Sequence, residues 1–313
     1  MSAAHISVLL AEVIEAFEGL TISSFVDGTL GAGGHASAIL KAHPEIVSFI
    51  GIDQDPTAHK IASARLEPWK EKTHFVHSNF SHLNTIFSDL RLTSCEGILL
   101  DLGVSSMQLD TAERGFSINN PGPLDMRMNP EGLLTAEEIV NDWSERDLAR
   151  IFRDYGEEKR WRNAARVIVK ARKEKPIKTT QELVDLLYPV LKDPRSAKSI
   201  HPLTLVFQAL RIAVNEELQV LEKTLKLAVD VISPGGRLAV ISFHSLEDRI
   251  AKQFFSYLAS DKESTKGIAG VFKDKKPILK IVTRKPVVPS DGENAMNPRA
   301  RSAKLRVVEK LPV

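Results

Sequence analysis

A short apolar run that leads into a glycine-rich turn, Phe25-Val-Asp-Gly-Thr-Leu-Gly-Ala-Gly-Gly-His35, constrains the fold of this chain more than any other feature. The run is typical of a β-strand, and a helix-like stretch opens at Ala36. The glycines at 31, 33 and 34 let a ligand come close to the backbone where a Cβ would clash. A strand, a glycine turn and a helix in this order predict an α/β sheet that holds a nucleotide-like cofactor at the carboxyl edge of its strands.

The alternation of strand and helix repeats through the first third of the chain. The expected strands are short and mostly apolar, at 25–28, 47–53, 73–77 and 97–102. Helices are expected at 34–42 and near 81–90, and Asp55-Pro56 is typical of a helix start with an N-cap followed by proline. Such alternation indicates a parallel, doubly wound sheet.

The pattern breaks after the fourth strand. Residues 106–132 are rich in Gly, Pro, Asn and Asp and predict a long ordered loop. Residues 135–230 read as helical, with capping-box patterns that begin at Thr135, Ser144 and Thr179. We therefore predict an α/β domain made of residues 1–106 and 213–313, interrupted by a mainly helical domain, residues 107–212, that recognises the substrate.

The strand pattern returns near the end of the chain. Further strands are expected at 235–243, 278–283 and 305–308, with a helix at 246–258 and polar loops at 260–276 and 284–300. Ser242-Phe-His-Ser-Leu-Glu-Asp248 is a strand-to-helix turn that Ser245 and Glu247 could cap. It lacks the G-x-S-x-G spacing of a hydrolase, so serine catalysis is not expected.

Composition narrows the class of protein. The 313 residues are 43% hydrophobic and 26% charged, which is typical of a globular protein of one large or two ordinary domains. No run of about 18 apolar residues is present, so no membrane span is expected. The single Cys95 is expected to be buried and excludes both an intramolecular disulfide and a cysteine zinc cluster. The N-terminus shows no secretory signal, and we expect a cytoplasmic protein.

Two cofactors fit the glycine turn. Gly31-Ala-Gly-Gly-His-Ala36 matches the G-x-G-x-x-A pattern of dinucleotide sites, and Asp53 lies where a ribose-binding acid is expected. The alternative is S-adenosylmethionine, which has no pyrophosphate and carries a positively charged methionine end. Asp27, directly before the turn, favours the second cofactor because a carboxylate attracts a cation and repels a pyrophosphate.

Other candidate residues fall at the same edge of the sheet. Asn79-Phe80 follows the third strand and could offer backbone and ring to an adenine, and Asp101 ends the fourth strand beside the expected position of the transferable group. Taken singly, each aspartate could be a cap and His35 a first-turn residue. Three acids at the ends of three strands favour a shared site. No second ligand lies at a metal-binding distance from His35 in the sequence, so no metal is expected.

Charge is unevenly distributed although the net charge is only +2. Residues 159–178 hold nine Lys or Arg and one acid, and residues 273–310 hold eleven and four. Within the first segment, basic residues recur every three or four positions and so share one face of a helix: Lys159, Arg162, Arg166, Lys170 and Lys173. Two basic surfaces of this kind suggest contact with a polyanion, although they could also be merely solvated.

Several strings along the chain are specific enough to identify a family. They begin with His5-Ile-Ser-Val-Leu-Leu10, Asp27-Gly-Thr-Leu-Gly-Ala-Gly-Gly-His35, Gly51-Ile-Asp-Gln-Asp-Pro56 and Leu99-Leu-Asp-Leu-Gly-Val-Ser-Ser106. They continue with Glu113-Arg-Gly-Phe-Ser117, Gly122-Pro-Leu-Asp-Met-Arg-Met128, Phe207-Gln-Ala-Leu-Arg-Ile212, Val214-Asn-Glu-Glu217, Ser242-Phe-His-Ser-Leu-Glu-Asp-Arg249 and Asn297-Pro-Arg-Ala-Arg-Ser-Ala-Lys-Leu-Arg306. In these strings the chain resembles the MraW/RsmH family of ribosomal small-subunit RNA methyltransferases over nearly its whole length.

The resemblance implies a class I S-adenosylmethionine-dependent methyltransferase sheet, Rossmann-like, with an inserted all-helical domain. It implies transfer of a methyl group to the exocyclic N4 of a cytidine in the decoding region of 16S ribosomal RNA. With Asp27 and Gly31 from the turn itself, the cofactor residues are expected to be Gly33, Gly34, His35, Asp53, Phe80, Asp101 and Gln108. One departure touches this set, because Met107 stands where many relatives have proline.

The turn of residues 101–106 is our candidate for the chemistry. A cytosine amino group is a weak nucleophile, and a hydrogen-bond acceptor near its protons would activate it. Asp101, Ser105 and Ser106 could supply that acceptor, from side chain or backbone. The alternative is that Asp101 only anchors the amino group of the cofactor.

RNA contact is assigned to the five basic residues of the inserted domain and, in the C-terminal segment, to Arg299 and Arg301. The target base must leave its stack, so an apolar wall is expected, and Phe116, Met126 and Met128 are either that wall or ordinary core. The expected partner is small-subunit ribosomal RNA or the assembled subunit, with no membrane, and the sequence is compatible with a homodimer. Two other classes stay open, an NAD-dependent oxidoreductase and a non-catalytic RNA-binding protein on a methyltransferase scaffold.

Overall fold

The computed structural model describes residues 7–192, 201–264 and 272–312, so His5 and Ile6 of the first family string lie outside the described residues. The chain divides into two compact units. The first consists of Met1–Gly103 and Leu218–Val313, and the second is Val104–Glu217. The insertion thus begins directly after the fourth strand of the sheet and ends where a long helix begins.

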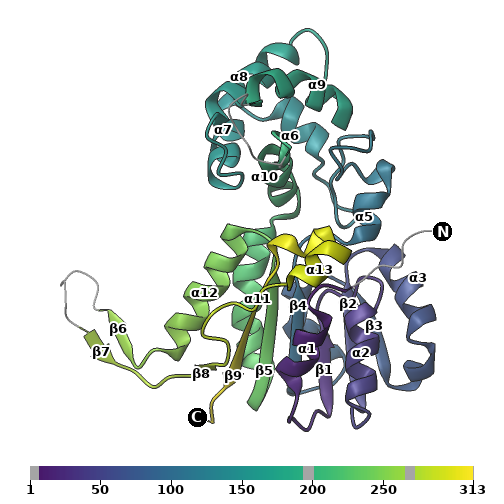
Figure 1. Cartoon of the computed structure of the whole chain (residues 1–313), viewed down its shortest axis with the longest axis vertical. Coiled ribbons are helices and arrows are strands. Elements are labelled where there is room, and N and C mark those ends of the chain that lie inside the picture. The colour runs from purple at the N-terminus through teal and green to yellow at the C-terminus, as the bar shows by residue number, and fades with distance from the viewer. Residues whose placement is uncertain (1–6, 193–200, 265–271, 313) are drawn as a thin grey trace. The chain divides into compact units, whose positions relative to one another are not determined.

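A seven-stranded sheet forms the centre of the first unit, in the order β3-β2-β1-β4-β5-β9-β8 (Figure 1). The first four strands are β1 (Ser24–Asp27), β2 (Ser48–Asp53), β3 (Thr73–His77) and β4 (Cys95–Asp101). The last three are β5 (Ile232–Ser242), β8 (Leu279–Ile281) and β9 (Lys304–Lys310). Strands β1 to β5 pair in parallel, whereas β9 is antiparallel to both β5 and β8. The predicted doubly wound, Rossmann-like α/β sheet is confirmed.

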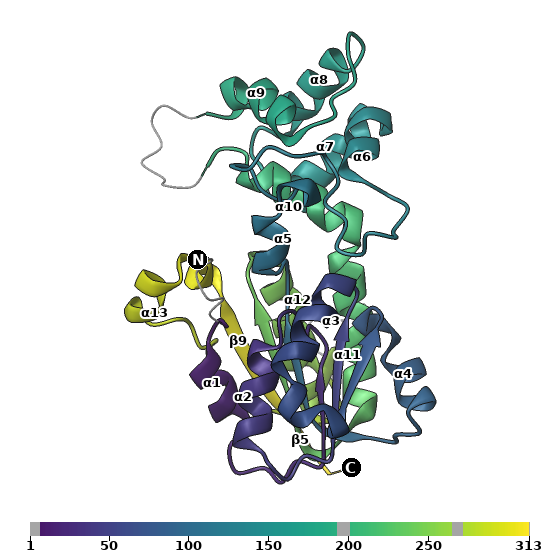
Figure 2. The same cartoon turned by 90° about the vertical axis from the view of Figure 1, so that its right-hand side faces the viewer.

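Helices cover both faces of this sheet (Figure 2). One face packs against α1 (Leu10–Phe17), α2 (Gly34–Ala42) and α3 (Pro56–Arg65), and the other against α4 (Leu83–Asp89), α11 (Glu217–Val231) and α12 (Ser245–Ala259). Strand β4 shows why both faces are needed. Leu99 contributes to the first core, and Ile98 and Leu100 contribute to the second. Each such fully buried side chain stabilises the fold by about 1.5–3 kcal/mol.

Local capping signals place the helix starts. Asp55 accepts the N–H of Thr57 ahead of Pro56, as expected for the start of α3. In the second unit, Thr135 and Thr179 form the predicted capping boxes with Glu138 and Glu182. A cap of this kind contributes about 1 kcal/mol. Because the capping residues follow a recognisable pattern, the sequence predicts where these helices begin.

The second unit is helical and has its own core. Its helices are α5 (Ser106–Asp110), α6 (Ala136–Asp142), α7 (Glu145–Asp154), α8 (Trp161–Ala171), α9 (Thr180–Leu191) and α10 (Thr204–Asn215), with a short 3-10 helix η3 (Ala112–Arg114). Phe116, Met126 and Met128 are buried in this core. They are ordinary packing residues, and the idea that they form an apolar wall for a base is wrong.

The segment 106–132 is more structured than a loop, because it contains α5 and η3. The rest of it is held by polar side chains that bind its backbone. Arg114 donates to the carbonyls of Arg127 and Met128, at 2.8 and 2.9 Å. Asn215 accepts the N–H of Met128 and donates to the carbonyl of Met126. These contacts join residues up to 89 positions apart, so composition alone could not predict them.

Two of the expected polar loops also contain regular structure. Residues 260–276 carry the paired strands β6 (Lys262–Ser264) and β7 (Phe272–Asp274). Residues 284–300 carry helix α13 (Asp291–Met296), which Ser290 caps by accepting the N–H of Glu293, and the 3-10 helix η4 (Pro298–Ser302) begins within them. Along the described ranges, helices that could cross a bilayer are absent.

Candidate functional site

The glycine turn between β1 and α2 adopts backbone conformations that favour glycine. Gly31 and Gly33 have φ values of 50° and 74°, in the left-handed region. The N–H of Gly31 donates to Asp53 Oδ2 at 2.8 Å, which ties the turn to the end of β2. Gly34 has a different role, because a Cβ there would lie 2.0 Å from Ser7 Oγ. Its missing side chain makes room for the segment that precedes α1.

Three carboxylates lie at one edge of the sheet. Asp27, Asp53 and Asp101 end β1, β2 and β4, which are adjacent parallel strands. Asp27 is 1% exposed, and burial raises its pKa to about 7. Burial, together with the nearby Glu247 carboxylate, raises the pKa of Asp101 to about 7 as well. Burial also raises the pKa of Asp53, against the hydrogen bonds that it accepts. The predicted cluster of acids is therefore present, and its members are held in an environment that disfavours their charge.

Asp101 has an unsatisfied acceptor. Its Oδ1 is buried and accepts no hydrogen bond from the residues that the structure describes. A buried acceptor without a donor is costly and is rare in folded proteins. The backbone of Asp101 is fixed, because its N–H donates to Thr29 Oγ1 at 2.7 Å. Thr29 was not among the predicted site residues, and only its place in the turn could have suggested it.

His35 connects Asp101 to the N-terminal segment. It lies in the first turn of α2 and is 7% exposed. Its Nε2 donates to the carbonyl of Val8 at 2.9 Å, and its Nδ1 lies 3.6 Å from Asp101 Oδ2. Burial lowers the pKa of His35, which Asp27 and Glu293 oppose. The ring is therefore oriented from both sides.

The ends of β2 and β3 form the rest of this edge. The two carboxylate oxygens of Asp53 accept the N–H groups of Gly31 and Asp55, one from each among the residues that the structure describes, and a carboxylate oxygen can accept a second hydrogen bond. Asn79 caps the 3-10 helix η2 (Phe80–His82) and donates to Gln54 Oε1 at 3.0 Å. Phe80 is half-buried at the start of η2. This edge therefore carries carboxylate oxygens at the end of β2 and an aromatic side chain at the start of η2.

Ser105, Ser106 and Gln108 belong to the helical unit, where they begin α5. Ser105 accepts the N–H of Gln108, and Gln108 Oε1 accepts the N–H of Ser105 at 3.1 Å. This capping box fixes the turn even though Met107 stands within it.

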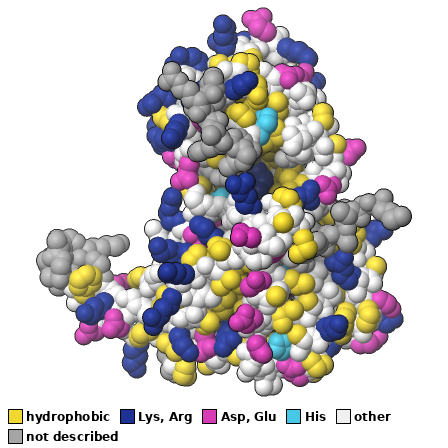
Figure 3. Space-filling view, in the orientation of Figure 1, with side chains coloured by type: hydrophobic (Ala, Val, Ile, Leu, Met, Phe, Trp, Pro, Cys, Tyr) yellow, Lys and Arg dark blue, Asp and Glu magenta, His cyan; other side chains and the backbone are white. Residues whose placement is uncertain are grey.

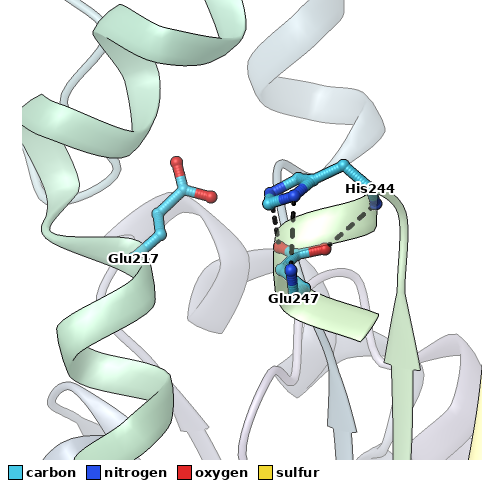
Figure 4. A group of neighbouring side chains, drawn as sticks. All are labelled: Glu217, His244 and Glu247. Atoms are coloured by element: carbon cyan, nitrogen blue, oxygen red, sulfur yellow. Dashed lines mark hydrogen bonds and ion pairs between the residues drawn. The ribbon is translucent and has the colours of Figure 1, made fainter. Parts of the chain in front are cut away.

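The turn after β5 contains a second buried polar group (Figure 4). His244, rather than Ser245, is the N-cap of α12, and its ring accepts the N–H of Glu247. Glu247 is buried and accepts the N–H of Phe243 at 2.8 Å. Figure 4 also labels Glu217, which pairs with Arg211 at 2.8 Å in the helical unit. Histidine is an uncommon N-cap, so the sequence offered Ser245 as the more usual choice.

The predicted basic face exists, with Arg162, Arg166 and Lys170 on α8 and Lys159 and Lys173 just outside its ends. Lys159, Arg162, Arg166, Lys170 and Lys173 are all exposed, whereas the buried side of the helix consists of Ala164, Ala165 and Ile168. Val167 and Ala171 are half-buried against the same core. Arg299 and Arg301 are exposed on η4 in the other unit.

A cavity on α7 and α8 adds residues that the sequence analysis missed. It measures about 540 Å³ and is lined by Ser144, Arg146, Asp147, Ala149, Arg150, Arg153 and Trp161. The guanidinium of Arg162 lies 3.9 Å from the centre of the Trp161 ring. Lys and Arg side chains gather over this side of the unit in Figure 3. The spacing of Arg146, Arg150 and Arg153 on one helical face is the sequence signal that could have revealed it.

Comparison with known proteins identifies the family. The model of the MraW methylase family matches residues 2–311. A protein named ribosomal RNA small subunit methyltransferase H from Protochlamydia amoebophila is 59% identical over 98% of this chain and 97% of its own length. A protein of the same name from Heliobacterium modesticaldum is 47% identical over 98% of each chain.

A solved rRNA methylase from Streptococcus thermophilus matches 99% of this chain and all of its own, at 11% identity and a TM-score of 0.44. At that TM-score it adds nothing to the assignment, which rests on sequence and on the strand order described above. The chain belongs to the MraW methylase family, and its first unit is a class I S-adenosylmethionine-dependent methyltransferase sheet interrupted by a helical insertion.

Proposed function

We propose that this protein transfers a methyl group from S-adenosylmethionine to the exocyclic N4 of a cytidine in the decoding region of 16S ribosomal RNA. The observation that carries the proposal is 59% identity, over nearly the full length of both chains, with a relative named ribosomal RNA small subunit methyltransferase H. The edge of the sheet adds chemical support, because it gathers carboxylates where a cationic cofactor would bind.

The residues present fit S-adenosylmethionine better than a dinucleotide. That cofactor carries an ammonium group, a positively charged sulfur and two ribose hydroxyls, all of which suit carboxylate partners. The buried Oδ1 of Asp101, which lacks a donor among the described residues, is the clearest indication of such a ligand. A pyrophosphate beside Asp27 and Asp101 would be repelled, which counts against an NAD-dependent oxidoreductase.

Each predicted cofactor residue has a role that its position supports. Each carboxylate oxygen of Asp53 can accept a second hydrogen bond, from a ribose hydroxyl. Phe80 would lie against the adenine ring, and Gly31 and Gly33 would let the backbone approach the cofactor. Asp27 and Asp101 would face its positive charges, with His35 behind Asp101. Gln108 stays a predicted cofactor residue from the family resemblance, and Gly34 would act indirectly by seating the segment around Ser7.

S-adenosylmethionine supplies a methyl group bonded to a positively charged sulfur. The protein's part is to align that methyl with N4 and to accept a proton as the amino group loses its conjugation with the ring. Asp101 is the first candidate for that acceptor, since a pKa of about 7 leaves it near balance at neutral pH. Ser105 and Ser106, at the start of α5, stay the other predicted candidates.

RNA would bind through two basic surfaces. The five exposed basic residues of the α8 face would contact phosphates, which positions RNA without reading its sequence. The cavity lined by Arg146, Arg150 and Trp161 extends this face with a side chain on which an unpaired base could stack. Arg299 and Arg301 would add phosphate contacts from the sheet unit. Substrate recognition is thus the proposed role of the helical unit.

The finer points of partner and location follow from the same proposal. The substrate would be the assembled small subunit or its RNA, and the protein would therefore act in the cytoplasm. A homodimer stays a prediction, and sedimentation of the purified protein would measure it.

Transfer of tritium from labelled S-adenosylmethionine to small ribosomal subunits, followed by nucleoside analysis, tests the function. We expect the label to appear in N4-methylated cytidine. Subunits from cells that lack this protein should accept the label, whereas fully modified subunits should not. Binding without transfer would favour a non-catalytic scaffold. In a parallel calorimetric titration we expect heat with S-adenosylmethionine and none with NAD, and the reverse would favour an oxidoreductase.

A further inference from the structure

The segment directly before α1 is held by three separate contacts, two with the cofactor edge and one with α13. Ser7 occupies the space left by the missing side chain of Gly34, with its Oγ 2.0 Å from where a Cβ would stand. The carbonyl of Val8 accepts the Nε2–H of His35. The N–H of Leu9 donates to Glu293 Oε1 at 2.7 Å. All three residues of the segment are buried.

Leu9 holds a backbone conformation that leucine avoids. Its φ and ψ are 53° and 38°, in the left-handed region, and its side chain is fully buried. A bulky residue in this region is an outlier whose conformation persists only when surrounding contacts hold it. Such strain gathers at functional sites. The contact between Leu9 and Glu293 is the one that acts directly on the strained residue.

Glu293 is well placed to hold that conformation. It comes from α13, 284 positions away in the sequence, and its own N–H is fixed by Ser290. Leu9 is the N-cap of α1, so the Glu293 carboxylate meets the positive end of that helix. A hydrogen bond to a charged group is roughly twice as strong as a neutral one. Glu293 also lies close enough to raise the pKa of His35.

The position of the Val8 carbonyl affects the surroundings of Asp101 through His35. Because the carbonyl of Val8 can only accept, the proton of neutral His35 must lie on Nε2. The lone pair on Nδ1 then faces Asp101 Oδ2 at 3.6 Å. At this distance the two atoms form no hydrogen bond, but the position of the His35 ring beside Asp101 depends on where the carbonyl of Val8 is held.

We propose that Glu293 is a positioning residue for methyl transfer, which fixes the backbone of Leu9 and Val8 and thereby sets the tautomer and orientation of His35 behind Asp101. The role of Glu293 in methyl transfer rests on the proposed function. The chain of contacts itself, from Glu293 to Asp101, lies wholly within the sheet unit.

The first test needs no cofactor and no RNA. Nitrogen-15 histidine NMR of the full-length protein reports which ring nitrogen of His35 carries the proton. We expect the Nε2–H tautomer in the wild type, assigned with an H35N variant. In Glu293→Ala we expect this signal to broaden or to shift toward the other tautomer, whereas Glu293→Gln, which keeps an acceptor for Leu9, should stay close to wild type.

The matched control is Asp291→Ala. Asp291 is an exposed acid in the first turn of the same helix, so this variant removes one acidic side chain from α13 without touching Leu9. We expect it to leave the His35 signal unchanged. Thermal melting of all variants shows whether each is folded. If Glu293→Ala fails to fold, the His35 signal of Glu293→Lys is compared with that of Glu293→Gln. This pair also differs in whether residue 293 can accept the N–H of Leu9.

The second test measures catalysis on small ribosomal subunits. We expect Glu293→Ala to weaken S-adenosylmethionine binding or the single-turnover rate about tenfold, the loss that one charge-assisted hydrogen bond allows, and Glu293→Gln to lose less than Glu293→Ala. An unchanged His35 tautomer in folded Glu293→Ala would overturn the proposal, as would unchanged kinetics beside a lowered melting temperature. Wild-type protein that fails to methylate any subunit would instead overturn the proposed function, and the NMR result would still stand or fall by itself.

Discussion

The carboxyl edge of the sheet and the α7–α8 surface of the helical unit both gather charge, but in opposite physical settings. At the sheet edge, Asp27 is buried and Asp101 has an acceptor with no donor among the described residues. On α8 and just beyond its ends, the five predicted basic residues are exposed. Buried charges are costly and demand a partner of fixed geometry, whereas exposed charges are screened and interchangeable. The first region is therefore suited to a small cationic cofactor, and the second to a long polyanion.

The largest effect should come from the buried region. Replacing Asp101 with Asn keeps the shape but removes both the charge and the proton-accepting ability. We expect the single-turnover rate to fall about 100-fold or more, the usual contribution of a positioned acid or base. Rapid-quench measurement with saturating S-adenosylmethionine checks this, alongside separate calorimetric measurement of its affinity. Weakened binding with an unchanged chemical step would reduce Asp101 to an anchor.

The next effect concerns pH. In the cofactor-free protein Asp27 and Asp101 have pKa values of about 7. A cationic cofactor binds the ionised acids, so below pH 7 its binding must expel protons. We expect affinity for S-adenosylmethionine to fall about tenfold per pH unit below 7 for each proton expelled, and to level off above. Calorimetry in buffers of different ionisation enthalpy measures the protons released. An affinity that does not vary between pH 5.5 and pH 8.5 would contradict the buried, raised-pKa acids.

The same shifts predict the stability of the cofactor-free protein. The two carboxyls ionise near 3.8 when unfolded and near 7 when folded, so the folded state holds the extra protons between those values. Below pH 3.8 these two groups make their full contribution to the free energy of unfolding. That contribution is lost as the pH rises to about 7. We expect Asp27→Asn to flatten this decline in urea unfolding. If the difference in unfolding free energy between wild type and variant did not vary with pH, burial would not shift the pKa of Asp27.

The smallest effect should come from the exposed surface. Neutralising Arg146 and Arg150 to Gln removes two exposed cations from the wall of the α7–α8 cavity. If both contact phosphates, the slope of log affinity against log salt for single-stranded RNA should fall by about 1.4. Fluorescence anisotropy at several salt concentrations measures it. The matched control, Lys223→Gln with Lys226→Gln, removes two exposed cations from α11 and should leave the slope unchanged. Equal slopes in all three proteins would mean that the cavity is only solvated.

Both regions were predicted from local sequence signals. The acids at the ends of β1, β2 and β4 follow from strand patterns, because parallel strands bring their carboxyl ends together. The α8 face follows from residue spacing on one helix. Both signals are local, and both were readable without a structure.

Contacts between distant segments were not predictable in this way. Nothing in the local sequence links Glu293 to Leu9, or the carbonyl of Val8 to His35, since these pairings depend on how the chain folds back. His244, and not Ser245, caps α12. The sequence did not predict this because serine is a more common N-cap residue than histidine. Phe116, Met126 and Met128, for which the sequence left an apolar wall and ordinary core open, are core.

The central claim is that the acids at the sheet edge hold a positively charged cofactor. A crystal structure of the full chain grown with S-adenosylmethionine tests this most directly. We expect the ribose hydroxyls on Asp53, the adenine beside Phe80, and a donor from the cofactor or an ordered water on Asp101 Oδ1. Clear density for the cofactor at any other place, or an edge filled by a dinucleotide in a competing soak, would contradict the account.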